Sequence, residues 1–374
     1  MGKKVIVSVI NDLVSDQRVH RTCSTLHEMG LEVCLVGREM RKSVELEPRK
    51  YKTHRMKLYF EKGALFYAEY NFRLFLYLLF HNYSILHSND LDTLLANYLA
   101  KKVKGGKLVY DSHEYFLEVP ELVSRPKVKN AWGRIERFIF PKLKHVFTVN
   151  KSIADIYEKQ YGVVLKIMRN VPVAQNKTNV SIKSRAELGL PEDKRIILLQ
   201  GAGINVDRGS EEILTAMQWI DAVFLIVGTG DVLPQLKEMV KSLKLESKVF
   251  FTGRVPFQKL MEYTAVADVG VTLDKDTNLN YKFSLPNKLF DYIHADLPVI
   301  ASNLVEVKRI ISEYKVGLVL SNHNPKEMAR EISEFLQNET LFSQTKINTL
   351  KAKSLLNWEV EKQVLIKEYE LLIG

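Results

Sequence analysis

The strongest constraint on the fold is a repeated alternation of short apolar runs with longer amphipathic segments along the 374-residue chain. Short apolar runs bounded by turn residues are typical of buried strands, and apolar residues at helical spacing predict helices between them. Such alternation predicts parallel sheets covered by helices on both faces. In the first half we expect strands at residues 5–10, 32–37, 85–88, 107–110 and 145–149, and helices at 16–29, 65–80, 92–104, 132–142 and 152–161.

The alternation stops at a polar stretch, residues 174–185, and then restarts. We interpret this stretch as a linker, because domain boundaries fall in exposed polar segments. The sequence thus predicts a first domain over residues 1–173, a second over 186–357 and a closing helix over 358–374. In the second domain we expect strands at residues 195–200, 223–227, 249–252, 269–273, 298–301 and 317–320, and helices at 210–219, 233–243, 258–267, 287–294, 305–315 and 326–337.

The composition narrows the class of protein. With 46% hydrophobic and 26% charged residues the chain is ordinary for a globular protein, which argues against disorder. The formal charge of +10 favours anionic partners such as nucleotide sugars or acidic lipid surfaces, whereas nucleic-acid binding has only this charge to support it. Cys23 and Cys34 are too few for a disulfide framework or a zinc site. We therefore expect a cytoplasmic protein without a signal peptide before the first strand.

One apolar and aromatic segment, residues 64–81, has two interpretations. Glu69 and Arg73 interrupt it, and its most apolar part is too short to span a membrane. It is either a core helix packed on the first sheet or an amphipathic helix lying on a membrane, with Lys57 and Lys62 nearby. The second interpretation would place the protein at the inner face of the membrane.

The stretch over residues 284–302, SLPNKLFDYIHADLPVIAS, reads as a ligand-binding helix that leads into a buried strand. Ser284 is a candidate N-cap, and Pro286 suits the first turn, where its missing N–H costs nothing. The start of a helix offers unpaired N–H groups and partial positive charge to a phosphate. Asp291 lies about two turns further on, so its carboxylate is placed to accept hydrogen bonds from both hydroxyls of a ribose.

This stretch resembles the nucleotide-binding helix of retaining glycosyltransferases with the GT-B fold, in family four (glycosyl transferases group 1), where an LPNK-L-F-E/D-Y run precedes P-V-I-A-S. The resemblance implies two Rossmann-like, doubly wound domains facing a central cleft, with the closing helix packed back on the first domain. It also implies a nucleotide-sugar donor whose ribose is held by Asp291. The family's second carboxylate, near the transferred sugar, is replaced here by Phe283.

Glycines after the first strand of the second domain indicate a phosphate site. Gly201 and Gly203 allow the backbone to approach a phosphate, and Arg208 can form a forked contact with diphosphate oxygens. The absence of G-x-G-x-x-G disfavours a dinucleotide-dependent hydride transfer. The resemblance implies a second basic residue where Ala202 stands, and two lysines are candidate replacements for its charge, Lys282 and Lys288.

Two further turns complete the expected donor site. The glycine turn over residues 228–230 reads best as a tight strand-to-helix connection, whereas Gly253 and Arg254 resemble the family's segment against the nucleotide base. The predicted donor-binding residues are Gly201, Gly203, Arg208, Gly253, Arg254, Ser284, Leu285, Pro286, Asn287, Lys288 and Asp291.

Polar residues at strand ends of the first domain predict the acceptor side, because ligands of parallel sheets bind beyond the carboxyl ends of the strands. His113 follows one such strand, and the resemblance implies that it contacts the donor sugar and supports catalysis. Asp111 and Glu114 are expected either to orient His113 or to bind acceptor hydroxyls, with loop capping as the alternative. The predicted acceptor-side residues are Asn11, Asp12, Arg18, His87, Asp90, Asp111 and Glu114.

We expect no metal and no other cofactor. Residues 90–92 and 274–276 match D-x-D, the metal-diphosphate motif of the other large glycosyltransferase fold, but matches this short are common by chance. An arginine and a helix start already provide positive charge for a diphosphate. The histidines show no metal-ligand spacing.

The expected reaction is glycosyl transfer with retention, from a nucleotide sugar to a glycan or lipid-linked acceptor hydroxyl, in cell-surface polysaccharide biosynthesis. Two alternatives remain open. A nucleotide-sugar epimerase shares this fold and would form product without an acceptor. A non-catalytic nucleotide-sugar-binding protein would bind donor without releasing nucleotide, and the residues at 202 and 283 favour it.

Overall fold

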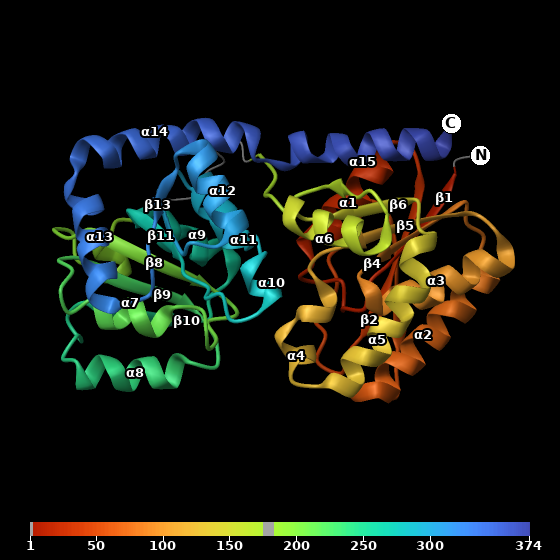
Figure 1. Cartoon of the computed structure of the whole chain (residues 1–374), viewed down its shortest axis with the longest axis horizontal. Coiled ribbons are helices and arrows are strands. Elements are labelled where there is room, and N and C mark those ends of the chain that lie inside the picture. Colours follow the sequence, from red (N-terminus) through yellow and green to blue (C-terminus); the bar gives the residue numbers. More distant parts are fainter. Residues whose placement is uncertain (1–2, 175–182) are drawn as a thin grey trace. The chain divides into compact units, whose positions relative to one another are not determined.

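The computed structural model describes residues 3–174 and 183–374 and divides the chain into two compact units (Figure 1). The N-domain comprises Met1–Asn170 and Glu359–Gly374, and the C-domain comprises Val171–Trp358. Residues 175–182 of the predicted linker lie outside the described residues.

The N-domain is built on a parallel sheet in the order β3-β2-β1-β4-β5-β6-β7. The strand order reverses between β1 and β4. From β1 the sheet is extended on one side by β2 and β3, and from β4 it is extended on the other side by β5, β6 and β7. The strands are β1 (Lys4–Ser8), β2 (Glu32–Glu39), β3 (Lys52–Lys57), β4 (Ile85–Asn89), β5 (Lys107–Ser112), β6 (His145–Thr148) and β7 (Lys166–Ile167).

Helices connect these strands, and several begin at side-chain caps. Asp16 Oδ1 accepts a hydrogen bond from Val19 N (3.0 Å) at the start of α1, and Asn150 Oδ1 accepts one from Ile153 N (3.0 Å) at the start of α6. The helices are α1 (Gln17–Glu28), α2 (Gly63–Phe80), α3 (Leu91–Lys104), α4 (Pro120–Val123), α5 (Pro126–Ile139) and α6 (Lys151–Tyr161), with 3₁₀ turns at Phe116–Glu118 and Phe140–Lys142.

The closing helix α15 (Trp358–Ile373) belongs to the N-domain for all but its first residue and is drawn in blue in Figure 1. The Tyr369 hydroxyl bonds to His87 Nδ1 of β4 at 2.8 Å. Glu368, which is buried, receives His145 Nδ1 at 2.6 Å and Lys166 Nζ at 2.7 Å. The helix is therefore fixed to three strands of the N-domain sheet by side-chain contacts.

The C-domain repeats this topology with a parallel sheet in the order β10-β9-β8-β11-β12-β13, which reverses between β8 and β11. The strands are β8 (Ile196–Gly201), β9 (Val223–Gly228), β10 (Val249–Gly253), β11 (Val269–Thr272), β12 (Val299–Ala301) and β13 (Gly317–Val319). The helices are α7 (Ser210–Ala216), α8 (Leu233–Ser242), α9 (Phe257–Val266), α10 (Leu279–Lys282), α11 (Asn287–His294), α12 (Val305–Tyr314), α13 (Pro325–Gln337) and α14 (Glu339–Leu355), after a 3₁₀ turn at Ala186–Leu188.

Side chains on opposite faces of the C-domain strands enter different hydrophobic clusters. Along β8, Ile197 and Leu199 pack in a cluster with α7, α8 and α13, whereas Ile196 and Leu198 pack in another with α11 and α12. Helices thus cover both faces of the sheet, as the apolar strands predict. The predicted architecture of two Rossmann-like domains is confirmed.

The glycine turn after β9 serves a close approach of two backbones. A Cβ at Gly228, whose φ is +141°, would lie 1.8 Å from Gly201 O. Thr229 N donates to Gly201 O (3.1 Å), and Ile204 N donates to Thr229 O (3.0 Å). The structure agrees with the tight-turn interpretation of residues 228–230, and this turn supports the loop that follows β8.

Candidate functional site

Tyr292 fixes helix α11 to the C-domain sheet at its switch point, where the strand order reverses between β8 and β11. Its hydroxyl accepts a hydrogen bond from Gln200 N (3.1 Å) and donates to Leu198 O (3.2 Å), both on β8. The ring covers Gly270 of β11, where a Cβ would lie 2.3 Å from it. Lys288 and Asp291, both half-buried, are therefore held on a rigid element beside the ends of β8 and β11.

The start of α11 differs from the sequence-based prediction. Ser284 is not its N-cap, because the Ser284 Oγ and N groups both donate to Tyr281 O (2.9 and 3.1 Å) and so close the preceding helix, α10. Pro286 occupies the N-cap position, and no described side chain caps the helix there. Asn287 is exposed at the first helical position.

Two cations and a buried carboxylate meet beside α11. Arg208 Nη1 donates to Asp274 Oδ2 at 2.5 Å, and Lys288 Nζ lies 3.9 Å from Asp274 Oδ1. The guanidinium of Arg208 also stacks on the ring of Tyr281, 4.3 Å from its centre. Asp274 directly follows Leu273 at the carboxyl end of β11, so the cluster lies where an open parallel sheet binds ligands.

The other predicted donor residues lie in the loop after β8, at the start of α11 and at the end of β10, which is two strands from β8. Gly201 is half-buried and Gly203 exposed in the loop after β8. Gly253, with φ of +68°, ends β10, and Arg254 after it is exposed. Leu285 is half-buried and packs against the hydrophobic core.

In the N-domain, His113 is held by two carboxylates and an amide. Its Nδ1 lies 3.2 Å from Asp90 Oδ2, and its Nε2 lies 3.3 Å from Asp111 Oδ2 and 3.2 Å from Asn89 Oδ1. The backbone N–H of His113 donates to Asp90 Oδ1 at 2.9 Å. These residues come from the ends of β4 and β5, which are adjacent strands.

This arrangement fixes the charge of His113. Burial alone favours the neutral ring, but the carboxylates of Asp90 and Asp111 outweigh it and raise the pKa of His113 well above its usual value. Asp90 itself has φ of +56° and ψ of 169°, a conformation that non-glycine residues rarely adopt. His113 is therefore an imidazolium at neutral pH, positioned by a strained backbone.

Three residues predicted on the acceptor side, Arg18, His87 and Asp111, are buried, which contradicts a direct contact with an acceptor. For Asp111 the structure agrees with the alternative that it orients His113. Arg18 is 3% exposed and donates to both oxygens of Asp111 (3.0 and 2.7 Å) and to Met168 O (2.8 Å). Asp111 is fully buried between Arg18 and His113. His87 is fully buried against Tyr369, and desolvation lowers its pKa to about 4. Asp111 thus orients His113 instead of binding an acceptor.

The remaining acceptor-side residues divide into turn residues and more open ones. Asn11 Oδ1 accepts from Leu13 N (2.9 Å), and Asp12 Oδ1 accepts from Val14 N (3.3 Å), so both build the turn after β1. Asp90 and Glu114 are half-buried at the ends of β4 and β5. Sequence reasoning placed the stretch over residues 87–90 at the acceptor site without a role for Asn89, and it treated Asp274 as a chance D-x-D match. Their positions directly after buried strands were the available signal.

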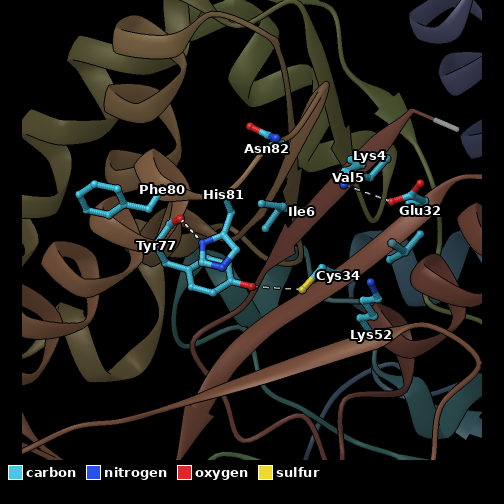
Figure 2. A pocket seen from close by; sticks show the side chains of 11 residues that line it. Lys4, Val5, Ile6, Glu32, Cys34, Lys52, Tyr77, Phe80, His81 and Asn82 are labelled. Carbon is cyan, nitrogen blue, oxygen red and sulfur yellow. Dashed lines mark hydrogen bonds and ion pairs between the residues drawn. The ribbon is translucent and has the colours of Figure 1, made fainter. Parts of the chain in front are cut away.

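The N-domain also has a cavity of about 250 Å³ (Figure 2). Lys4 and Lys52, which line it, are the first residues of β1 and β3, so it lies at the amino ends of the strands. In Figure 2 the Tyr77 hydroxyl points to Cys34 Sγ, 3.4 Å away. The cavity therefore lies at the opposite edge of the sheet from His113 and is not part of the candidate site.

Comparison with solved structures gives the fold class. Sucrose-phosphate synthase from Thermosynechococcus elongatus superimposes with a TM-score of 0.78 at 17% identity, covering 99% of both chains. HepE from Anabaena, solved in complex with UDP, gives a TM-score of 0.72 at 13% identity, covering 98% of this chain and 99% of the other. With its two doubly wound domains and sites at the strand ends, the protein has the GT-B fold.

Sequence comparison gives the family. The model of glycosyl transferases group 1 matches residues 180–352, and the model of glycosyltransferase family 4 matches residues 16–170. An uncharacterised glycosyltransferase of Methanocaldococcus jannaschii is 22% identical over 298 residues, covering 75% of this chain and 71% of the relative. The chain belongs to the group 1 glycosyltransferases.

Proposed function

We propose that the protein transfers a sugar from a nucleotide-sugar donor to a hydroxyl of a glycan or lipid-linked acceptor, with retention of the anomeric configuration. One observation carries the proposal: Arg208 and Lys288 both approach Asp274 at the switch point of the C-domain sheet, and Asp291 follows Lys288 on α11. The two cations suit a diphosphate, and the carboxylate one helical turn further suits a ribose. The UDP-bound and UDP-glucose-bound structures of Anabaena HepE support the same donor class.

The difficult step is the loss of the nucleoside diphosphate from the anomeric carbon. Fixed cations aimed at the leaving oxygens stabilise the developing charge, and one such donor contributes roughly 3 kcal/mol. Arg208 and Lys288 are assigned this role, so we propose that the reaction needs no metal. The first carboxylate of each D-x-D match has another partner: Asp90 holds His113, and Asp274 holds Arg208.

The proposal gives His113 an electrostatic role. Because both ring nitrogens face carboxylates, its charge rather than its basicity is the available chemistry. The positive charge of the imidazolium would stabilise the charge that develops on the departing diphosphate.

Retention is proposed from the family resemblance. The position of the second carboxylate is occupied by Phe283, which leaves no carboxylate there to act as a nucleophile. Attack of the acceptor on the face that the diphosphate leaves, assisted by that diphosphate, requires no such group. We place the reaction in the cytoplasm, in the assembly of cell-surface polysaccharides.

The donor assignment predicts how Asp291 affects binding. Replacing Asp291 by alanine should lower the affinity for UDP by about 10–100-fold, because a hydrogen bond to a charged group is worth roughly 1.5–3 kcal/mol. If a thermal-shift panel shows that another nucleoside diphosphate binds better, that nucleotide takes the place of UDP. The variant should also lose the preference of the wild type for the ribonucleotide over its 2′-deoxy analogue. Isothermal titration calorimetry measures both.

The exposed Asp276, which pairs with Lys282 on the surface of the same domain, supplies the matched control. Asp276→Ala should leave both affinities unchanged. Normal nucleotide affinity in Asp291→Ala, or an unchanged preference for the ribonucleotide, would remove the ribose assignment.

We also propose a peripheral membrane contact through α2. Its buried stripe, which includes Tyr70 and Leu74, packs in the N-domain, and its outer face exposes Phe72 and Phe80, the latter by 82%. In the part of the chain that the structure describes, no helix is long and apolar enough to cross a bilayer. Exposed lysines at 57 and 62 suit anionic headgroups beside this face.

The membrane proposal predicts that Phe72→Ser with Phe80→Ser lowers partitioning onto phosphatidylglycerol-rich vesicles at least ~10-fold, since burying one phenylalanine is worth about 1.5–3 kcal/mol. Vesicle co-sedimentation measures the effect, and nucleotide affinity should not change. The control is the pair Leu350→Ser and Leu355→Ser, which are exposed on α14 of the C-domain. Equal partitioning of both double variants would refute the contact.

A further inference from the structure

We propose that Lys288 is the second cation of the diphosphate site and that Asp274 is the positioning residue that holds Lys288 and Arg208 together. The inference rests on the proposed function and deepens it. It replaces the basic residue missing at Ala202 with one on another element, and it gives a role to a carboxylate that reads as a chance motif in the sequence.

Asp274 is placed to organise both cations. It is 1% exposed, and its Oδ2 receives Arg208 Nη1 at 2.5 Å. Its Oδ1 has no hydrogen-bond partner among the described residues, and Lys288 Nζ approaches that oxygen to 3.9 Å. A buried carboxylate is costly unless it is paired, so the two cations are tied to this point of the sheet.

The loop that carries Arg208 is held against the carboxyl end of β11, which Asp274 follows. A Cβ at Gly209, whose φ is +71°, would lie 2.3 Å from Leu273 O, so only glycine allows this approach. Lys275 N donates to Asp207 O at 2.9 Å. With Tyr281 beneath its guanidinium, Arg208 is fixed from three sides before any ligand binds.

The structure distinguishes Lys288 from the other candidate, Lys282. Lys282 pairs with Asp276 at 2.9 Å, and the two side chains are 38% and 52% exposed. Lys288 is 16% exposed and points to the carboxylate that Arg208 also binds. The Arg208–Lys288–Asp274 cluster retains a net positive charge, which suits a diphosphate.

Asp274 also affects the charge of Lys288. Burial lowers the pKa of Lys288, the carboxylate of Asp274 opposes this shift, and the nearby guanidinium of Arg208 adds to it. Without Asp274, the ammonium would be left beside another cation in a poorly hydrated site. Asp274 therefore favours the protonated form of Lys288.

The test compares Lys288→Met with Lys282→Met, a matched change six residues upstream. UDP, GDP and ADP are titrated by calorimetry, each beside its parent nucleoside. Lys288→Met should lower the affinity for the nucleoside diphosphate that binds best by about 10-fold or more, and it should change the affinity for the parent nucleoside by less than about 2-fold. Lys282→Met should change neither, and equal affinities in the two variants would overturn the inference.

The result also separates this inference from the proposed function. If Asp291→Ala lowers the affinity for UDP while Lys288→Met does not, the diphosphate is held by other residues and only the inference fails. If neither substitution matters, or if none of the nucleotides binds the wild type, the donor site itself is wrong.

A pH profile isolates the role of Asp274. In Asp274→Asn the pKa of Lys288 should fall further, so UDP affinity should begin to decline at a lower pH than in the wild type as the pH is raised. Adding Lys288→Met should abolish this pH dependence. A flat profile in Asp274→Asn would show that Asp274 does not maintain the charge of Lys288.

Discussion

Replacing His113 by alanine should lower kcat roughly 100-fold or more while changing donor-nucleotide affinity less than about 3-fold. The imidazolium is held by Asp90 and Asp111 at the carboxyl end of β5, whereas the nucleotide-binding residues lie in the C-domain. Its charge is therefore available to the transition state without contributing to nucleotide binding. Release of nucleoside diphosphate from the preferred donor, with water as acceptor, measures turnover.

His145 provides the matched control for a lost histidine in the same sheet. It begins β6 and binds Glu368 of α15, which Lys166 also holds, so His145→Ala should leave turnover nearly unchanged. A His113→Ala protein that retains near-normal turnover would remove the catalytic assignment. Equal losses in kcat and in nucleotide affinity would instead indicate a general structural defect.

The charge state of His113 extends this prediction to pH. Because its pKa is raised well above the usual value, the wild type should show no loss of kcat from histidine deprotonation around neutral pH. Asp90→Asn removes one of the two supporting carboxylates and should lower that pKa. As the pH is raised, the activity of this variant should therefore begin to fall at a lower pH than the activity of the wild type.

The parts of the fold that the sequence predicts are those with strong apolar periodicity. Helix α11 runs over Asn287–His294, as the spacing of its buried residues predicts. Strand β3 was missed because its sequence, KTHRMK, has only Met56 buried. An edge strand needs little apolar surface, so it leaves almost no pattern to recognise.

Helix α14 was missed for a related reason. Its buried face contains Thr345 and Thr349 between Phe342 and Ala352, so polar residues occupy positions where an apolar period would be visible. The residues do follow helical spacing, but their composition hides it. Tertiary packing supplies what the local pattern does not show.

The candidate site was predicted in location more than in detail. Strand-end rules placed Arg18, His87 and Asp111 near the site, but they could not show that the side chains turn inward. Arg18 and Asp111 are 93 residues apart in the chain, so their pairing depends on the finished sheet. The same holds for Asp274 and Arg208, which are 66 residues apart.

Replacing Glu136 by glutamine should remove a pH dependence of stability worth about 3 kcal/mol. Glu136 of α5 is fully buried, and desolvation raises its pKa from 4.5 to about 7, although the Tyr161 hydroxyl donates to Oε1 at 2.6 Å. The fold therefore favours the protonated acid. Its contribution is full below about pH 4.5, falls as pH rises to about 7, and is lost above that.

Glutamine imitates the neutral acid at every pH. Glu136→Gln should match the wild type near pH 4.5 and exceed its unfolding free energy by up to about 3 kcal/mol near pH 8, as measured by urea denaturation. The control is Glu158→Gln, because Glu158 is exposed on α6 of the same domain. If the stability difference between wild type and Glu136→Gln did not change with pH, Glu136 would be ionised in the fold, and burial would not control its charge.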